Sequence, residues 1–130
     1  MTSGITVEIA PGELIDKITI LEIKLARIAD AAKLANVRIE HDVLVASRAA
    51  AVVPSVELDG LTGELKTVNE ALWEIEDDIR DCERTGDFGE RFIELARAVY
   101  KTNDKRVLLK RQINDLLGSS LVEEKSYAAY

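Results

Sequence analysis

The stretch DFGERFIELARAVYKTNDKRVLLKRQINDLLG, residues 87–118, has the pattern of one long helix. Asp87 is of a residue type that caps helix N-termini, and Glu90 stands where the second arm of a capping box belongs. Gly118 can take the left-handed conformation that often follows a helix. At about 1.5 Å per residue, a helix of this length is about 45 Å long, which is longer than a small domain is wide.

Seam positions recur along this stretch at alternating steps of four and three, which is a heptad pattern. The positions are Phe88, Phe92, Leu95, Val99, Thr102, Arg106, Leu109, Ile113 and Leu116. The seam is apolar at both ends and polar in the middle, at Thr102 and Arg106. An unbroken seam also runs from Leu58 to Cys82, and the short link 84–86 permits only an antiparallel return. These features predict a hairpin of helices over 56–84 and 88–117.

The first half of the chain predicts two further helices, over 12–29 and 31–51. Pro11 suits the first position of the earlier helix, whose apolar residues lie on several sides, so we expect it to be central in the bundle. Asp30 can cap the later helix, and Pro54 stops it.

Both ends of the chain remain outside these helices. Residues 1–10 read as an extended arm, because Ile5, Val7 and Ile9 alternate with polar residues; the arm either pairs as a strand or packs over the bundle. The tail 119–130 is either a short helix or extended. The chain is therefore predicted to be one all-α domain over 1–130, an antiparallel bundle of about four helices built on a long helical hairpin, with a short N-terminal extended arm.

Composition limits the function classes. The formal charge of −7 argues against nucleic-acid binding, which needs local cations. No apolar run approaches the length of a membrane span, and no signal peptide is apparent, so we expect no membrane insertion. The single cysteine, Cys82, cannot form an internal disulfide, and a reducing, cytoplasmic location is expected.

Four long motifs span the chain: PGELIDKITILEIK at 11–24, NEALWEIEDDIRDCE at 69–83, FIELARAVYKTNDKR at 92–106 and LVEEKSYAAY at 121–130. Together they resemble a family of short bacterial proteins of unknown function. Members of that family often lie among surface-polysaccharide and glycosyltransferase genes, so the resemblance implies a cell-envelope setting. It implies no activity and no catalytic residues.

The residues offer no catalytic or metal constellation. His41 has no cysteine or second histidine for a metal and no adjacent nucleophile to activate, and Cys82 falls on an apolar seam. The carboxylate pairs Glu13/Asp16 and Glu74/Asp77 are too far apart for a two-metal clamp. We therefore expect no catalytic residues, no metal and no cofactor.

The polar interruption of the last helix is the candidate site. Its predicted members are Asp16, Glu22, Asn69, Trp73, Thr102, Asn103, Arg106 and Lys110. Buried polar groups must be paired, so Arg106 either bonds to Asp16 or Glu22 inside the bundle, which is favoured, or faces a small anion pocket.

The distribution of charged residues along the predicted hairpin indicates which partners the protein could bind. The charged residues of 70–83 are all acidic except Arg80, and those of 97–111 are all basic except Asp104, which predicts an acidic turn end and a basic open end. This favours a homodimer, by antiparallel self-association, or a charged protein partner; the competing interpretation is two solvated faces. The function predicted is a non-catalytic interaction or scaffolding module. The alternative is a small helical enzyme or sensor that binds an anionic metabolite, a nucleotide-sugar or sugar phosphate, around Arg106.

Overall fold

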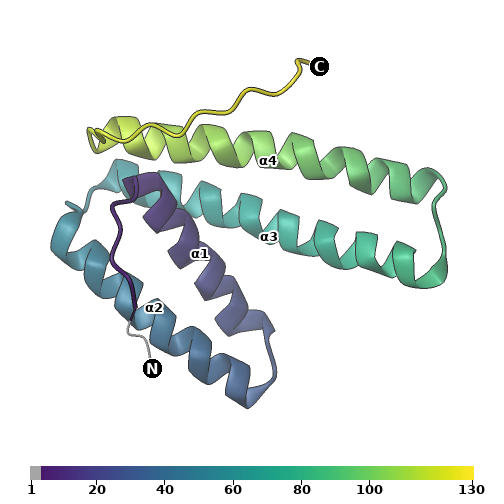
Figure 1. Ribbon diagram of the computed structural model, residues 1–130, viewed down its shortest axis with the longest axis horizontal. Helices are drawn as coiled ribbons and strands as arrows, with labels where there is room; N and C mark the ends of the chain where they lie inside the picture. The colour runs from purple at the N-terminus through teal and green to yellow at the C-terminus, as the bar shows by residue number, and fades with distance from the viewer. Residues whose placement is uncertain (1–3) are drawn as a thin grey trace.

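The computed structural model describes residues 4–130, and in that range it is all-α, with four helices and no strand. The helices are α1 (Pro11–Arg27), α2 (Ala31–Ala51), α3 (Val56–Thr85) and α4 (Glu90–Leu116). The predicted fold class is confirmed, and the helix bounds lie within about two residues of those predicted (Figure 1).

The hairpin of α3 and α4 forms one layer, and α1 crosses it near its open end, with α2 packed on the outside of α1 (Figure 1). At about 1.5 Å per residue, the 30-residue α3 is about 45 Å long, whereas the 17-residue α1 is about 25 Å long. The turn end of the hairpin therefore projects beyond α1 and α2.

The core lies where α1 meets the hairpin. Ile15, Leu58, Leu65 and Ile113 form a buried cluster that joins α1, α3 and α4. Helix α1 is buried on several sides, as its sequence predicted, through Leu14, Ile15, Ile18, Leu21 and Ile23. Cys82 is also fully buried, in agreement with its seam position.

Glycines end both hairpin helices. Gly86 (φ 71°) follows α3 and Gly118 (φ 66°) follows α4, and both are left-handed. After α4, the amide of Ser119 donates to the carbonyl of Asn114 at 2.9 Å, which is the long bond of a Schellman motif. The start of α4 differs from the prediction: the helix begins at Glu90, because the Asp87 carboxylate accepts from the amide of Gly89 at 3.1 Å within the turn instead of capping the helix.

The described segments at both ends of the chain, before α1 and after α4, are extended. The N-terminal arm is described from residue 4, since residues 1–3 of the predicted arm lie outside the described residues, and it lies beside α2 without forming a strand. The tail after Ser119 is also extended, so the short-helix alternative is wrong. Glu123 of the tail reaches Lys110, and the Tyr130 hydroxyl bonds to Asp104.

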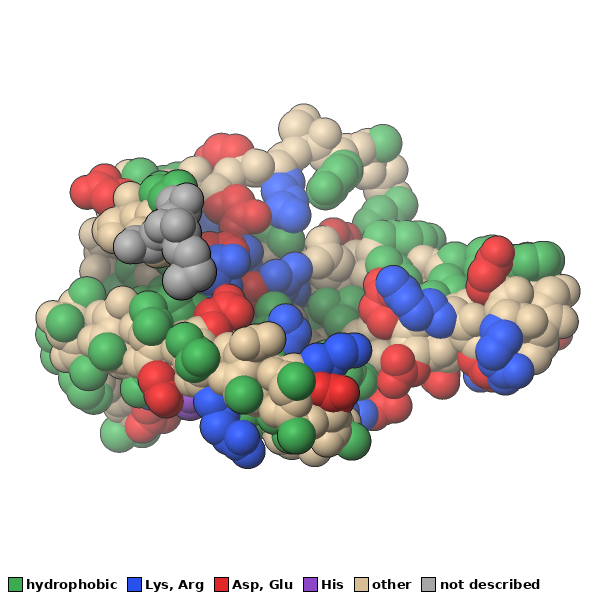
Figure 2. All heavy atoms as spheres, turned by 60° about the horizontal axis from the view of Figure 1, so that its bottom comes forward, with side chains coloured by type: hydrophobic (Ala, Val, Ile, Leu, Met, Phe, Trp, Pro, Cys, Tyr) green, Lys and Arg blue, Asp and Glu red, His purple; other side chains and the backbone are tan. Residues whose placement is uncertain are grey.

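Exposed ion pairs cover the turn end of the hairpin. Arg84 pairs with Asp81 on α3, while Arg91 of α4 reaches Asp78 and Asp81 at 3.8 and 3.6 Å. Red and blue side chains lie side by side on this projecting end in Figure 2. Exposed pairs of this kind are screened by solvent and add little to stability, so they solubilise this end more than they stabilise it.

Within residues 4–130, no helix combines the length and apolar composition needed to cross a membrane.

Gly12 sets how closely α1 approaches α4. A Cβ at this position would stand 2.4 Å from the backbone oxygen of Lys110 and 2.8 Å from Oδ1 of Asn114. The Gly12 amide donates to that same Oδ1 at 2.7 Å. The two helices are thus in backbone contact at this point.

We predict that Gly12→Ala destabilises the protein by about 1–3 kcal/mol, because the added methyl forces the helices apart. Gly60→Ala on α3 is the matched control. Nothing lies within 4 Å of its added methyl, so it gains up to about 1 kcal/mol of helix propensity. Urea unfolding measures both, and equal stability of the two variants would contradict the close approach.

Candidate functional site: a buried polar cluster between α1, α3 and α4

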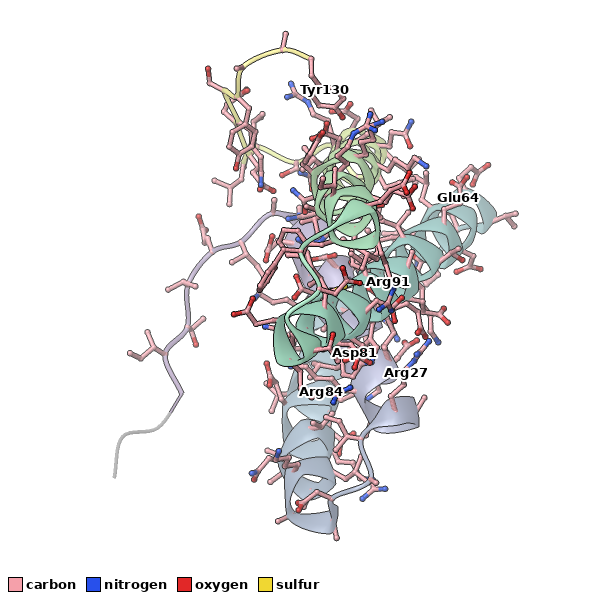
Figure 3. All side chains as sticks on the ribbon, turned by 90° about the vertical axis from the view of Figure 1, so that its right-hand side faces the viewer. Arg27, Glu64, Asp81, Arg84, Arg91 and Tyr130 are labelled. Atoms are coloured by element: carbon pink, nitrogen blue, oxygen red, sulfur yellow. The ribbon has the colours of Figure 1, made fainter. Side chains whose placement is uncertain are left out.

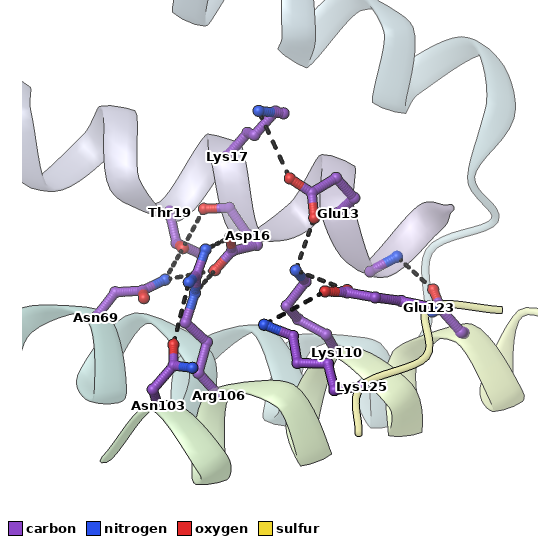
Figure 4. Close-up of polar contacts among 12 residues, drawn as sticks. Glu13, Asp16, Lys17, Thr19, Asn69, Asn103, Arg106, Lys110, Glu123 and Lys125 are labelled. Atoms are coloured by element: carbon purple, nitrogen blue, oxygen red, sulfur yellow. Dashed lines mark hydrogen bonds and ion pairs between the residues drawn. The ribbon is translucent and has the colours of Figure 1, made fainter. Parts of the chain in front are cut away.

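Polar side chains gather in the interior where α1 crosses the hairpin (Figure 4). The buried ones are Asp16, Thr19, Asn69, Lys110 and Asn114. They come from three helices, so the cluster exists only when the bundle is assembled. A buried polar group costs free energy unless it is hydrogen-bonded, so the partners of each member decide what the cluster can do.

Asp16 and Arg106 form a two-bond ion pair at the centre of the cluster. Nε of Arg106 donates to Oδ1 of Asp16 at 2.9 Å, and Nη2 donates to Oδ2. The Asp16 side chain is 1% exposed and that of Arg106 is 26% exposed. The bond to Asp16 raises the pKa of Arg106 and outweighs burial, which lowers it. A planar guanidinium suits this arrangement because its fork matches a carboxylate.

Asn69 and Thr19 complete the shell around the Asp16 carboxylate. Nδ2 of Asn69 donates to Oδ1 of Asp16 at 2.9 Å and to the Thr19 hydroxyl oxygen at 3.0 Å. The Thr19 hydroxyl donates in turn to the backbone oxygen of Asp16 at 2.8 Å. On the other side, Nη1 of Arg106 makes a longer bond, 3.4 Å, to Oδ1 of Asn103. The carboxylate is thereby held by α3 and α4 together.

Lys110 forms a second charged group one turn further along α4. Its ammonium contacts the carboxylates of Glu13 at 2.6 Å and Glu123 at 3.0 Å, and its side chain is 7% exposed. Burial lowers the pKa of Lys110, but the hydrogen bonds to the carboxylates of Glu13 and Glu123 together raise it by more than burial lowers it. The pKa of Lys110 is therefore above its usual value. For Glu13 the directions are opposite: burial raises the pKa of this carboxyl group, but the hydrogen bond and the positive charge of Lys110 lower it below its usual value. Lys110 thus ties the tail to α1.

The structure separates the predicted site residues into groups. Asp16, Asn69, Asn103 and Arg106 share one hydrogen-bonded network, and Lys110 belongs to the adjacent one. Asp16, and not Glu22, is therefore the partner of Arg106.

The remaining predicted members lie outside the network. Glu22 pairs instead with Lys66 at 3.1 Å. Trp73 lines a surface hollow together with Asn69 and Arg106, without a hydrogen bond to either among the described residues. Thr102 is half-buried and its side chain has no hydrogen bond within residues 4–130.

Sequence reasoning missed Thr19, Asn114 and Glu123 as cluster members and did not connect Glu13 to Lys110. Two of these carried a usable signal. Thr19 lies three residues after Asp16, and Asn114 lies four residues after Lys110, so each shares a helix face with a predicted member. Glu123 carried none, because it lies in a tail without periodicity.

The arrangement is charge-balanced. Each cation of the cluster contacts at least one carboxylate, so an anionic ligand would have to displace a protein carboxylate to bind tightly. Among the residues that the structure describes, no group of three or more His, Cys, Asp or Glu could hold a metal ion. The geometry is that of a structural network that fixes how α1 sits on the hairpin.

Comparison with known proteins places the chain in a family. The model of a family of unknown function (DUF6165) matches residues 5–130, so the chain belongs to that family. No curated protein and no solved structure matches it.

We predict that Arg106→Ala destabilises the protein by about 3 kcal/mol, because it leaves the Asp16 carboxylate buried without its cation. Arg106→Leu loses less stability than Arg106→Ala, because the leucine packs in the bundle, but it stays less stable than the wild type because Asp16 is still buried without a cation. Arg91→Ala removes an exposed guanidinium and serves as the control, with a loss of about 1 kcal/mol or less. Denaturant unfolding provides the comparison, and equal losses in Arg106→Ala and Arg91→Ala would show that the Asp16 pair is not holding the bundle.

Proposed function

Since membership of this family brings no known activity, we propose from the chain's own residues that the protein is a non-catalytic interaction or scaffolding module that works as a homodimer. The observation that carries the proposal is a contrast between interior and surface. The polar cluster is closed on itself, whereas large apolar side chains lie on the outside.

The closed cluster supports a module without chemistry of its own. A catalytic group needs an activated nucleophile or base beside an open position for the substrate. Here the carboxylates of Asp16 and Glu13 are committed to Arg106 and Lys110. Their bonds stabilise the bundle and leave no free acid–base pair in the cluster.

The exposed apolar residues support an interaction surface. Single exposed apolar residues are normal, so the grouping matters more than the number. Leu108 is 59% exposed and Leu116 is 43% exposed. Both line one open groove between α3 and α4, together with Leu61, Val68 and Leu109. A grouped apolar surface of this kind is typical of a protein-binding site.

Two further points support a proposal for where the protein is located and which process it serves. Cys82 is buried and free, which suits a reducing compartment, so a cytoplasmic location is part of the proposal. The resemblance to proteins encoded among surface-polysaccharide genes suggests that the module serves cell-envelope assembly.

A second candidate function is the binding of an anionic metabolite, such as a nucleotide-sugar or sugar phosphate. One observation favours it: Arg106 is partly exposed, and its Nη1 makes only the 3.4 Å bond to Asn103. Arg106 lines two surface hollows, one of them together with Tyr100 and the other together with Trp73. If this function holds, phosphate raises the melting temperature of the wild type but not of Arg106→Leu, and that variant is the more stable of the two without phosphate.

We predict that the protein is a dimer at micromolar concentration, because burial of the α3–α4 groove in a second copy removes apolar surface from water. Light scattering coupled to size-exclusion chromatography should give twice the chain mass of 14.4 kDa. A mass equal to one chain at these concentrations would remove the main support for the scaffolding proposal.

A further inference from the structure

The open groove lies on the face of the hairpin that α1 does not cover. Residues Arg106, Lys110 and Ile113 of α4 turn toward α1, whereas Lys105, Leu108 and Gln112 line the groove. Figure 3 looks along the hairpin from its turn and shows Glu64 and Arg91 on the side away from the N-terminal arm. We call this side the outer face, defined by Leu61, Glu64, Val68, Lys105, Leu108, Leu109 and Leu116.

A basic stripe borders the outer face on α4. Arg97, Lys101 and Lys105 follow one another at steps of four, so they share one side of the helix, and all three are exposed. None of them contacts a carboxylate within 4.0 Å in the described chain, whose ion pairs involve other residues. In an acidic chain, three neighbouring cations without partners are a marked local feature.

An acidic stripe borders the same face on α3. Glu70, Glu74 and Asp78 also follow at steps of four, and they lie off the seam that faces α4. Glu74 bonds to Arg27 and Asp78 contacts Arg91, while Glu70 has no ion pair within the described residues. The three acids of this stripe meet two cations, Arg27 and Arg91, so this edge of the hairpin is left with one negative charge in excess, whereas the basic stripe on the other edge has no paired acid.

The two stripes lie at the same level along the hairpin. Leu72 lines a hollow with Val99 and Asn103, and Lys105 lines the outer groove with Val68. Residues 70–78 are thus beside residues 97–105. Asp78 reaches Arg91 of α4, but no acid of this stripe lies within 4.0 Å of Arg97, Lys101 or Lys105 in the described chain.

We infer that the occupant of the outer face is a second copy of this chain, related by a two-fold axis parallel to the hairpin. This deepens the proposed function, on which it rests, by naming the surface and the partner. Such an axis places α3 of each copy over α4 of the other without a shift along the hairpin. It sets the acidic stripe against the partner's basic stripe on both edges and brings the two apolar grooves together.

Because residues 70–78 lie beside residues 97–105 along the hairpin, the two-fold axis predicts which residues of the two copies face each other. Asp78 faces the partner's Arg97, Glu74 faces the partner's Lys101, and Glu70 faces the partner's Lys105. An antiparallel two-fold would instead lay α3 on α3 and α4 on α4, which opposes like stripes. The parallel arrangement is closed and isologous, so it stops at a dimer and makes a four-helix bundle of two hairpins.

Charge complementarity favours a second copy over an unrelated partner. Each chain carries a formal charge of −7, so two copies repel unless their opposite charges are matched locally. The crossed stripes provide that match. Gly63 also lines the groove, and nothing lies within 4 Å of the position of its missing Cβ, so a partner helix can approach there closely.

The test is a charge swap measured as the dimer dissociation constant by sedimentation. Lys101→Glu with Lys105→Glu should raise the constant by about 100-fold, because acids then face acids across both edges. Glu70→Lys with Glu74→Lys should do the same by opposing cations. An equimolar mixture of the two double variants should recover a dimer with close to wild-type affinity, because each edge again pairs opposite charges.

The matched control reverses two cations elsewhere. Lys33→Glu with Arg38→Glu makes the same change in net charge as the Lys101 and Lys105 reversal, but on α2, where both residues are exposed and neither has an ion pair within the described chain. This variant should dimerise as the wild type does. Thermal melting of every variant checks that the fold is kept.

The outcomes separate the interface from the proposed function. A monomeric wild type overturns both the homodimer and this interface. A wild-type dimer that resists both double reversals overturns the interface alone. Two variants that dissociate but do not recover on mixing contradict the parallel pairing of α3 with the partner's α4.

Discussion

The bond between Asp16 and Arg106 is the constraint on which the rest of the structure depends. A carboxylate that is almost fully buried is strongly destabilising when it has no cationic partner, and Arg106 supplies one through two parallel bonds. Asn69 brings α3 into the same contact. One pair therefore fixes the position of α1 along the hairpin, which apolar packing alone would leave open to shifts by a turn.

The position of α1 determines which surfaces remain open. Helix α1 is short, so once it is held at Asp16 and at Gly12 it covers one face of the hairpin near its open end. Helix α2 packs on α1, and the tail is tied to Lys110 on the same side (Figure 4). The apolar groove of the outer face stays open because α1, α2 and the tail pack elsewhere on the hairpin, and no residue of theirs lines it. The closed interior and the open surface thus have one common cause.

Sequence patterns predicted the helices well because each has a long seam and recognisable ends. They also identified Arg106 as a cation that needs a partner, since a polar residue replaces an apolar one in the seam. They could not choose between Asp16 and Glu22, because these lie on different faces of α1 and the crossing geometry decides between them. The sequence could not identify Glu123 as a member of the cluster, because its contact with Lys110 depends on where the tail folds back.

The most direct test of this account is a double-mutant cycle on Asp16→Ala and Arg106→Ala, measured by denaturant unfolding. If the two side chains form the fixed pair, the double variant is little worse than either single variant, and the coupling free energy is about 2–3 kcal/mol. Losses that simply add would contradict the account, because they would show that Asp16 and Arg106 stabilise the bundle independently.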